Sequence, residues 1–151
     1  MKEKIVILGS GESGVGAAIL AVQKHYDVFV SDLGIIPSNT KQKLHELGVA
    51  FEEKKHTFDL IKKADTVVKS PGIPDNTPLI MDLIAQGISV ISEIEFAFRH
   101  IAPNAKIIGI TGTNGKTTTA LLTYHLLKEV GLDVALAGNV GYSLAKRVSE
   151  K

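Results

Sequence analysis

KIVILGSGESGVG, residues 4–16, joins a short apolar run to a glycine-rich turn. The run KIVIL suits a strand that is covered on both faces, as in a parallel sheet. Apolar residues from Ala17 to Val22 then continue at helical spacing. Strand, glycine loop and helix in this order predict the first unit of an α/β fold with a parallel sheet.

The glycine loop also indicates a ligand site. Gly9, Gly11 and Gly14 satisfy G-x-G-x-x-G, and Asp32 follows the next predicted strand, DVFVS. In such a loop the glycines permit the turn and the approach of a phosphate, and the carboxylate binds ribose hydroxyls. Nicotinamide dinucleotides, flavin dinucleotides and UDP-sugars all carry these groups, so the motif leaves the ligand open. A turn required only for helix–strand packing is the alternative.

The same alternation continues along the chain. We expect helices at residues 40–47, 58–63 and 79–85, and strands at 49–51, 65–69 and 88–91. This order predicts a parallel sheet with helices on both faces. SPGIP, residues 70–74, follows one of these strands, where ligands of such sheets gather, although alone it is more typical of a structural turn.

The character of the chain changes after residue 92. A helical stretch at 93–98 is followed by Ala102, Pro103 and Asn104, which break a helix. We therefore divide the chain into a Rossmann-like domain at 1–92, a linker at 93–105 and the start of a second α/β domain at 106–151. Because that second part is too short for a closed core, we expect it to be truncated and the chain to be a fragment of a longer protein.

TGTNGKTT, residues 111–118, predicts a phosphate-binding loop in the second domain. It lies between a predicted buried strand at 107–110 and an amphipathic helix that reaches about residue 130. Backbone N–H groups of such a loop bind phosphates, a lysine such as Lys116 reaches the terminal phosphates, and a hydroxyl such as that of Thr117 ligates Mg²⁺. The general motif has a glycine where Ile110 stands, so the loop here is the tighter GTNGKT.

A second glycine pair, GNVG at residues 138–141, follows a predicted strand at 133–137. Asn139 offers an amide donor and acceptor between the two glycines. Alone, this pattern is more often a turn than a site. A helical segment is expected after it.

The composition of the chain argues against several classes of function. The chain has 151 residues, a formal net charge of +1 and no cysteine, which argues against nucleic-acid binding through bulk charge and against disulfides or thiolate metal sites. The N-terminal apolar run is too short for a signal peptide, and no segment has membrane-spanning length. A cytoplasmic protein without nucleic-acid or membrane partners is the expectation.

Together, GSGESGVG with Asp32, SPGIP, TGTNGKTT and GNVG, in this order, resemble the Mur ligase family of ATP-dependent amide ligases in peptidoglycan precursor synthesis. The resemblance covers essentially the whole chain, and SPGIP favours the member that adds D-glutamate. It implies UDP-N-acetylmuramoyl-L-alanine, D-glutamate and ATP as substrates, Mg²⁺ as cofactor, an acyl-phosphate intermediate and a monomer.

The resemblance also implies residue roles. Substrate contacts would come from Gly11, Glu12, Ser13 and Gly14 at the pyrophosphate, Asp32 and Leu33 near the uridine, Ser70, Pro71 and Gly72 beside the UDP moiety, and Asn139 from the second domain. ATP would be bound by Gly112, Thr113, Asn114, Gly115, Lys116, Thr117 and Thr118, with Lys116 catalytic and Thr117 on Mg²⁺. The family's remaining catalytic and amino-acid-binding features would lie beyond residue 151, so we expect the chain alone to be inactive as a ligase.

Three alternatives stay open at this point. One is a sibling ligase that adds a different amino acid. Another is an NAD-dependent oxidoreductase that uses the GSGESG loop but leaves TGTNGKTT unexplained. The last is a nucleotide-sensing module without catalytic activity.

Overall fold

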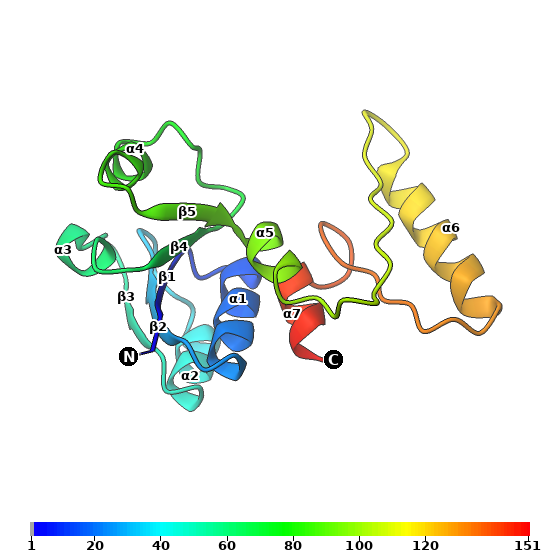
Figure 1. Cartoon of the computed structure of the whole chain (residues 1–151), viewed down its shortest axis with the longest axis horizontal. Helices are drawn as coiled ribbons and strands as arrows, with labels where there is room; N and C mark the ends of the chain where they lie inside the picture. The colour runs from blue at the N-terminus through cyan, green and yellow to red at the C-terminus, as the bar shows by residue number, and fades with distance from the viewer. Residues whose placement is uncertain (1) are drawn as a thin grey trace.

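The computed structural model describes residues 2–151 and contains a five-stranded parallel sheet in the order β3-β2-β1-β4-β5 (Figure 1). The strands are β1 (Lys4–Leu8), β2 (Asp27–Ser31), β3 (Ala50–Glu52), β4 (Thr66–Lys69) and β5 (Ser89–Ser92). β1 is central and pairs with β2 on one side and β4 on the other. The predicted parallel α/β sheet is confirmed.

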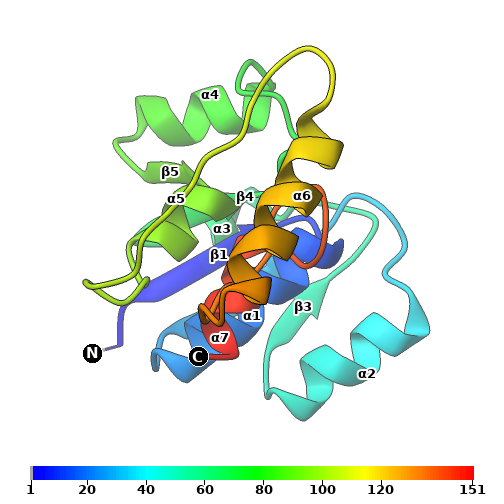
Figure 2. The ribbon, with the colours of Figure 1, turned by 90° about the vertical axis from the view of Figure 1, so that its right-hand side faces the viewer.

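Within residues 2–151, seven helices connect or follow these strands. They are α1 (Glu12–Gln23), α2 (Ser38–Glu46), α3 (Phe58–Ile61), α4 (Pro78–Ala85), α5 (Glu93–Phe98), α6 (Lys116–Glu129) and α7 (Leu144–Ser149). Figure 2 shows α2 and α4 at opposite ends of the sheet. The helices predicted at 40–47, 58–63 and 79–85 are present, with bounds that differ by at most two residues, and α1 begins at Glu12, five residues before the apolar run that predicted it.

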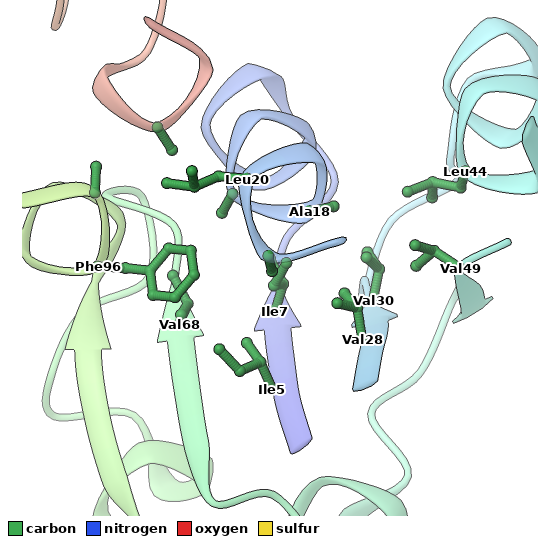
Figure 3. Close-up of a cluster of buried hydrophobic side chains, with 14 residues drawn as sticks. Ile5, Ile7, Ala18, Leu20, Val28, Val30, Leu44, Val49, Val68 and Phe96 are labelled. Carbon is green, nitrogen blue, oxygen red and sulfur yellow. The ribbon is translucent and has the colours of Figure 1, made fainter. Parts of the chain in front are cut away.

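Alternate side chains of β1 enter two different cores, because successive side chains of a strand point to opposite faces. Ile5 and Ile7 belong to one buried cluster with residues of α1, α2, α5 and α7, which Figure 3 shows. Val6 and Leu8 pack on the other face, against residues of α3 and α4. All four side chains are at most 1% exposed, so the run KIVIL is covered on both faces as predicted.

Helix α5 belongs to the core of the sheet domain. Phe96 and Ala97 are 2% and 0% exposed and lie in the same cluster as Ile5 and Ile7. A helix that the sequence assigned to the connecting segment thus closes one face of the sheet. Chain positions 102–105, which follow it, are exposed.

The strands predicted at 107–110 and 133–137 are wrong. Residues 107–110 form no strand, and Ile107 and Ile108 are 55% and 61% exposed. The second stretch contributes only an isolated bridge between Ala137 and Tyr142. A strand forms by hydrogen bonding to a neighbouring strand, and neither stretch has such a neighbour within the described residues.

Helix α6 stands apart from the sheet in Figure 1, and none of its residues is buried. Helix α7 returns to the sheet domain, where Ala145 is 0% exposed and lies in the core cluster of α1 and α5. Within residues 2–151, every helix is too short or too polar to span a bilayer.

Candidate functional site

The order of strands reverses at β1 and β4, and the loops that follow these two strands meet there. In open α/β sheets, ligands bind in the crevice at this topological switch point. The glycine motif after β1, Gly9 to Gly14, runs from the loop into the first turn of α1, and the loop after β4 begins at Ser70. A Cβ atom built on Gly9 would lie 2.5 Å from the Ser70 hydroxyl oxygen, so these two loops are in close contact.

The three glycines of the motif differ in whether the backbone requires glycine. Gly9 has φ of +94°, where other residues are strained. Gly14 permits close helix–strand packing, since a Cβ there would lie 1.9 Å from the carbonyl oxygen of Gly9. Gly11 has neither constraint: its φ is −67°, and a Cβ would meet nothing within 4 Å. The open side of the loop is therefore at Gly11.

Gly11 is also the N-cap of α1, and no side chain caps this helix. The first N–H groups of a helix lack intrahelical partners and, with the helix dipole, favour an anion. Gly11 is exposed and Ser13 is half-buried at this end. The loop therefore has the features of a phosphate-binding turn.

The loop after β4 has a buried hydroxyl without a partner. The Oγ atom of Ser70 is buried and makes no hydrogen bond within the described residues. Its backbone is fixed, because Ser70 N–H donates to Leu8 and its carbonyl accepts from Ile73 N–H. Pro71 and Gly72 are exposed beside it. The hydrogen-bonding capacity of this hydroxyl is therefore unused within the described residues.

Asp32 is oriented by the first loop. Its Oδ2 accepts hydrogen bonds from Ser10 N–H and Ser10 Oγ, both at 2.6 Å, and its Oδ1 accepts from Gly34 N–H at 2.7 Å. Burial raises the pKa of Asp32, but these hydrogen bonds outweigh it, so the pKa lies below its usual value and the group is ionised at neutral pH. Oδ1 keeps one lone-pair position for a ligand hydroxyl.

Leu33, directly after Asp32, is 67% exposed. Its side chain is therefore accessible at the carboxyl end of β2. An apolar side chain in this position can cover the face of a base or sugar but cannot donate a hydrogen bond to it.

Behind Asp32 lies a polar cluster that sequence reasoning missed. Glu52, 9% exposed, accepts hydrogen bonds from Ser31 Oγ and from the N–H and hydroxyl of Thr57, at 2.5 to 2.7 Å. Ser31 Oγ also lies 2.7 Å from Nδ1 of His56. The residues come from the ends of β2 and β3 and the turn after β3, and no motif in the sequence relates them. They fix the end of β2, which carries Asp32.

The pKa values of this cluster follow from its hydrogen bonds and burial. Burial raises the pKa of Glu52, but the donors on Thr57 and Ser31 outweigh this, and the pKa lies below its usual value. Burial lowers the pKa of His56, against the opposing effect of the Glu52 and Asp32 carboxylates. A carboxylate and a neutral imidazole at pH 7 follow from these directions.

The GNVG loop is tethered to the start of α1. Ser143 N–H donates a 3.0 Å hydrogen bond to Oε1 of Glu12, and the loop is closed by Gly138 N–H on the carbonyl of Tyr142. This brings the segment that carries the exposed Asn139 to the first domain's glycine loop. The side chain of Glu12 is directed at the second segment through this bond.

The loop TGTNGKTT turns into α6 through Gly112 and Gly115, which have φ of +151° and +75°. Nζ of Lys116 donates to the carbonyls of Gly112 and Thr113 at 2.5 and 3.1 Å, which leaves one of its three N–H donors. Residues 111–119 are exposed, and within residues 2–151 no hydrogen bond joins this loop to the sheet domain. The structure thus brings the first-domain site residues and the Asn139 segment together but leaves the second loop apart.

No group of three or more His, Asp or Glu side chains that could hold a metal occurs within residues 2–151. A hydroxyl such as that of Thr117, at the start of α6, can provide a single Mg²⁺ ligand beside a bound phosphate. The assignment of Thr117 to Mg²⁺ stays a prediction.

The sheet order and the loops at its switch point define a Rossmann-like nucleotide-binding domain. Residues 3–92 match the family described as Mur ligase MurD-like, N-terminal domain, and residues 110–150 match the Mur ligase middle domain. The chain belongs to the Mur ligase family. This confirms the resemblance and counts against the oxidoreductase alternative.

Proteins of similar sequence are named as ligases of this family. The chain is 54% identical to a UDP-N-acetylmuramoylalanine–D-glutamate ligase from Cytophaga hutchinsonii over 98% of its own length, and 55% identical to one from Bacteroides fragilis over 99%. It spans 33% of the length of each of these relatives. Among solved structures, a murein peptide ligase from Psychrobacter arcticus is similar with a TM-score of 0.61 and 29% identity, over 90% of this chain and 28% of that one.

Proposed function

We propose that this chain is the UDP-substrate-binding part, with the beginning of the ATP-binding part, of a ligase that adds D-glutamate to UDP-N-acetylmuramoylalanine. The names of relatives more than 50% identical support this substrate pair. The observation that carries it is the meeting of the glycine loop, Asp32, the Ser70 loop and the Asn139 segment at one end of the sheet. Three of these groups follow parallel strands, where nucleotide ligands bind.

Different site residues would bind different parts of the substrate. The N–H groups of Ser13 and Gly14 would bind the diphosphate at the open side of Gly11, and Asp32 would accept a ribose or uracil donor through Oδ1. Leu33 would lie against the uridine, and the Ser70 hydroxyl, with the backbone at Pro71 and Gly72, would border the UDP moiety. Glu12 would act at this site through its backbone, because its carboxylate accepts from Ser143 N–H.

The second loop would hold ATP and Mg²⁺. Residues 112–118 offer N–H groups at a helix start, and the remaining donor of Lys116 would contact a phosphate. When bound, ATP would supply the phosphoryl group that activates the substrate carboxylate as an acyl phosphate, leaving ADP. The amine of D-glutamate would then attack the acyl carbon, and phosphate and a proton would leave as the amide forms. The part of Lys116 in this reaction is to neutralise charge on the transferred phosphate.

Calorimetric titration of this chain with UDP-N-acetylmuramoyl-L-alanine tests the first half of the proposal. We expect binding of this ligand and none of NAD. Asp32→Asn should weaken binding roughly tenfold, because an amide cannot accept all the hydrogen bonds that the carboxylate accepts. Asp27→Asn, at the opposite end of β2, is the matched control and should bind like the wild type.

Binding of NAD in place of the UDP-sugar would contradict the proposal. So would equal weakening by the Asp32 and Asp27 substitutions. Thermal unfolding of each variant shows whether the fold is retained.

Lys116→Ala tests the ATP-binding half, in a protein of the relatives' full length that carries this chain. We expect turnover to fall roughly a hundredfold or more, because the cation that stabilises the transferred phosphate is lost. Binding of the UDP-substrate should be unchanged, since residues 112–118 are not bonded to the sheet domain. Lys128→Ala, on the same helix, is the control, and undiminished turnover with Lys116→Ala would contradict the assignment.

A further inference from the structure

A cavity of about 310 Å³ opens at the N-terminal end of α1, between α2 and α7. Figure 3 shows α1 lying between these two helices. The glycine loop contributes Ser10, Gly11 and Glu12 to the wall, and α2 and α7 contribute one lysine each, Lys43 and Lys146. The cavity is therefore continuous with the proposed diphosphate site, but its cations come from two other parts of the chain.

Helix α7 is held at this cavity by close packing. Ala145 N–H donates a 2.5 Å hydrogen bond to the carboxyl group of Glu93, which is 3% exposed. A Cβ on Gly16 would lie 2.3 Å from Ser143 Oγ and 3.2 Å from Cβ of Lys146, so only glycine allows α7 to approach α1 this closely. The backbone that carries Lys146 is thus fixed against the first turns of α1.

The side chain of Lys146 also packs against an aromatic ring. It is half-buried, and its Nζ lies 3.4 Å from the centre of the Tyr142 ring, in a cation–π contact. Lys43 is exposed on α2 and forms none of the ion pairs within residues 2–151. Glu12 is the acidic residue of the wall, and its Oε1 is engaged by Ser143 N–H.

We propose that Lys146 and Lys43 are further substrate-binding residues, which bind the diphosphate of the UDP-substrate together with the N–H groups of the glycine loop. The inference rests on the proposed function. Two cations beside one partnered carboxylate give the cavity a net positive charge, which suits a diphosphate. Since Lys146 belongs to α7, docking of the segment after GNVG also completes the first domain's site.

A charge series at Lys146 tests this, with UDP as the probe and calorimetric titration of the whole chain as the measurement. We expect Lys146→Arg to bind UDP within about threefold of the wild type and Lys146→Met roughly tenfold more weakly, and Lys146→Glu should be weaker still. Added salt should weaken the wild type more than Lys146→Met, because a charge–charge contact is screened. Lys43→Met should weaken binding in the same direction.

Lys128 provides the matched control. It also lies over a tyrosine, with Nζ 5.6 Å from the centre of the Tyr124 ring, but on α6. Lys128→Glu should leave the affinity for UDP unchanged. If Lys146 acted only through its contact with Tyr142, the three variants would differ in thermal unfolding, but added salt would weaken UDP binding equally in the wild type and in Lys146→Met. Thermal unfolding also identifies any variant that has lost its fold.

The outcomes separate the two proposals. If the wild type does not bind UDP, the proposed function fails. If it binds UDP and Lys146→Glu binds equally well, the proposed function stands and the role of Lys146 is overturned.

Discussion

Gly11 is the N-cap of α1 and Gly14 lies in the first turn of this helix, and a methyl group would have different effects at the two positions. At Gly14 it would overlap the carbonyl oxygen of Gly9, on the rigid backbone between β1 and α1. At Gly11 it would project into open space. Gly14 therefore serves the fold, and Gly11 is available to a ligand.

We predict that Gly14→Ala lowers the free energy of unfolding by about 3 kcal/mol or more, because neither backbone segment can yield to the overlap. Gly11→Ala should unfold close to the wild type but bind the UDP-substrate more weakly. Denaturant unfolding and calorimetric titration of both variants check this. The reverse pattern, a stable Gly14→Ala with an unfolded Gly11→Ala, would show that the packing of the loop differs from that described.

Among the helices, α7 is the one that attaches the end of the chain to the sheet domain, although it has only six residues. Its first N–H groups are bound by Glu12 and Glu93, two acidic side chains from separate helices of the sheet domain. Burial raises the pKa of Glu93, the bond from Ala145 opposes this, and the nearby charge of Glu12 raises the pKa further. Overall the pKa lies above its ordinary value.

A raised pKa gives the docking of α7 a dependence on pH. The stabilisation that Glu93 contributes is fully present below its ordinary pKa of 4.5. It is lost as the pH rises through the higher pKa of the folded state, because the buried carboxyl group of Glu93 must then ionise. We predict that Glu93→Gln removes this loss, since a side-chain amide oxygen still accepts from Ala145 N–H. Melting temperatures between pH 4 and pH 8 should fall less for Glu93→Gln than for the wild type.

Glu129→Gln, on the exposed helix α6, is the control and should follow the wild type. If the melting temperatures of Glu93→Gln and the wild type changed equally with pH, this would contradict the role given to the Glu93 carboxyl group.

Across the whole molecule, the sheet domain and α6 differ in what stabilises them. Val6 and Val67 are 0% exposed in a core covered on both sides, whereas Leu122 and Leu126 of α6 are each 56% exposed. A helix of this length without packing is marginal in water. Local stability should therefore be very uneven along the chain.

We predict that amides of α6 exchange with deuterium far faster than those of β1 and β4, because opening α6 exposes no buried side chain. Hydrogen–deuterium exchange followed by mass spectrometry measures both regions in one sample. Protection of α6 equal to that of β1 would show that its exposed leucines are covered in solution.

Local patterns were sufficient for the elements and motifs of the first domain. Residues 4–16 specify a strand covered on both faces and a glycine turn, because spacing, burial and turn geometry depend on neighbours in the sequence. The glycines of the loop at 111–118 likewise indicated a turn, and Gly112 and Gly115 have positive φ there. By contrast, the apolar run at 107–110 predicted a strand that is absent, since its formation depends on a pairing partner elsewhere.

Only the tertiary structure decided which of these pieces meet. The sheet order places Ser70 beside Gly9 and Asp32 beside Ser10. The buried carboxyl group of Glu93 and the exposed one of Glu12 bring α7, with Lys146, to the same end. Such contacts join residues far apart in the chain, and a single sequence carries no periodic signal for them. The glycine loop could therefore be predicted from its own residues, whereas the cationic cavity beside it depends on how α2 and α7 pack around α1.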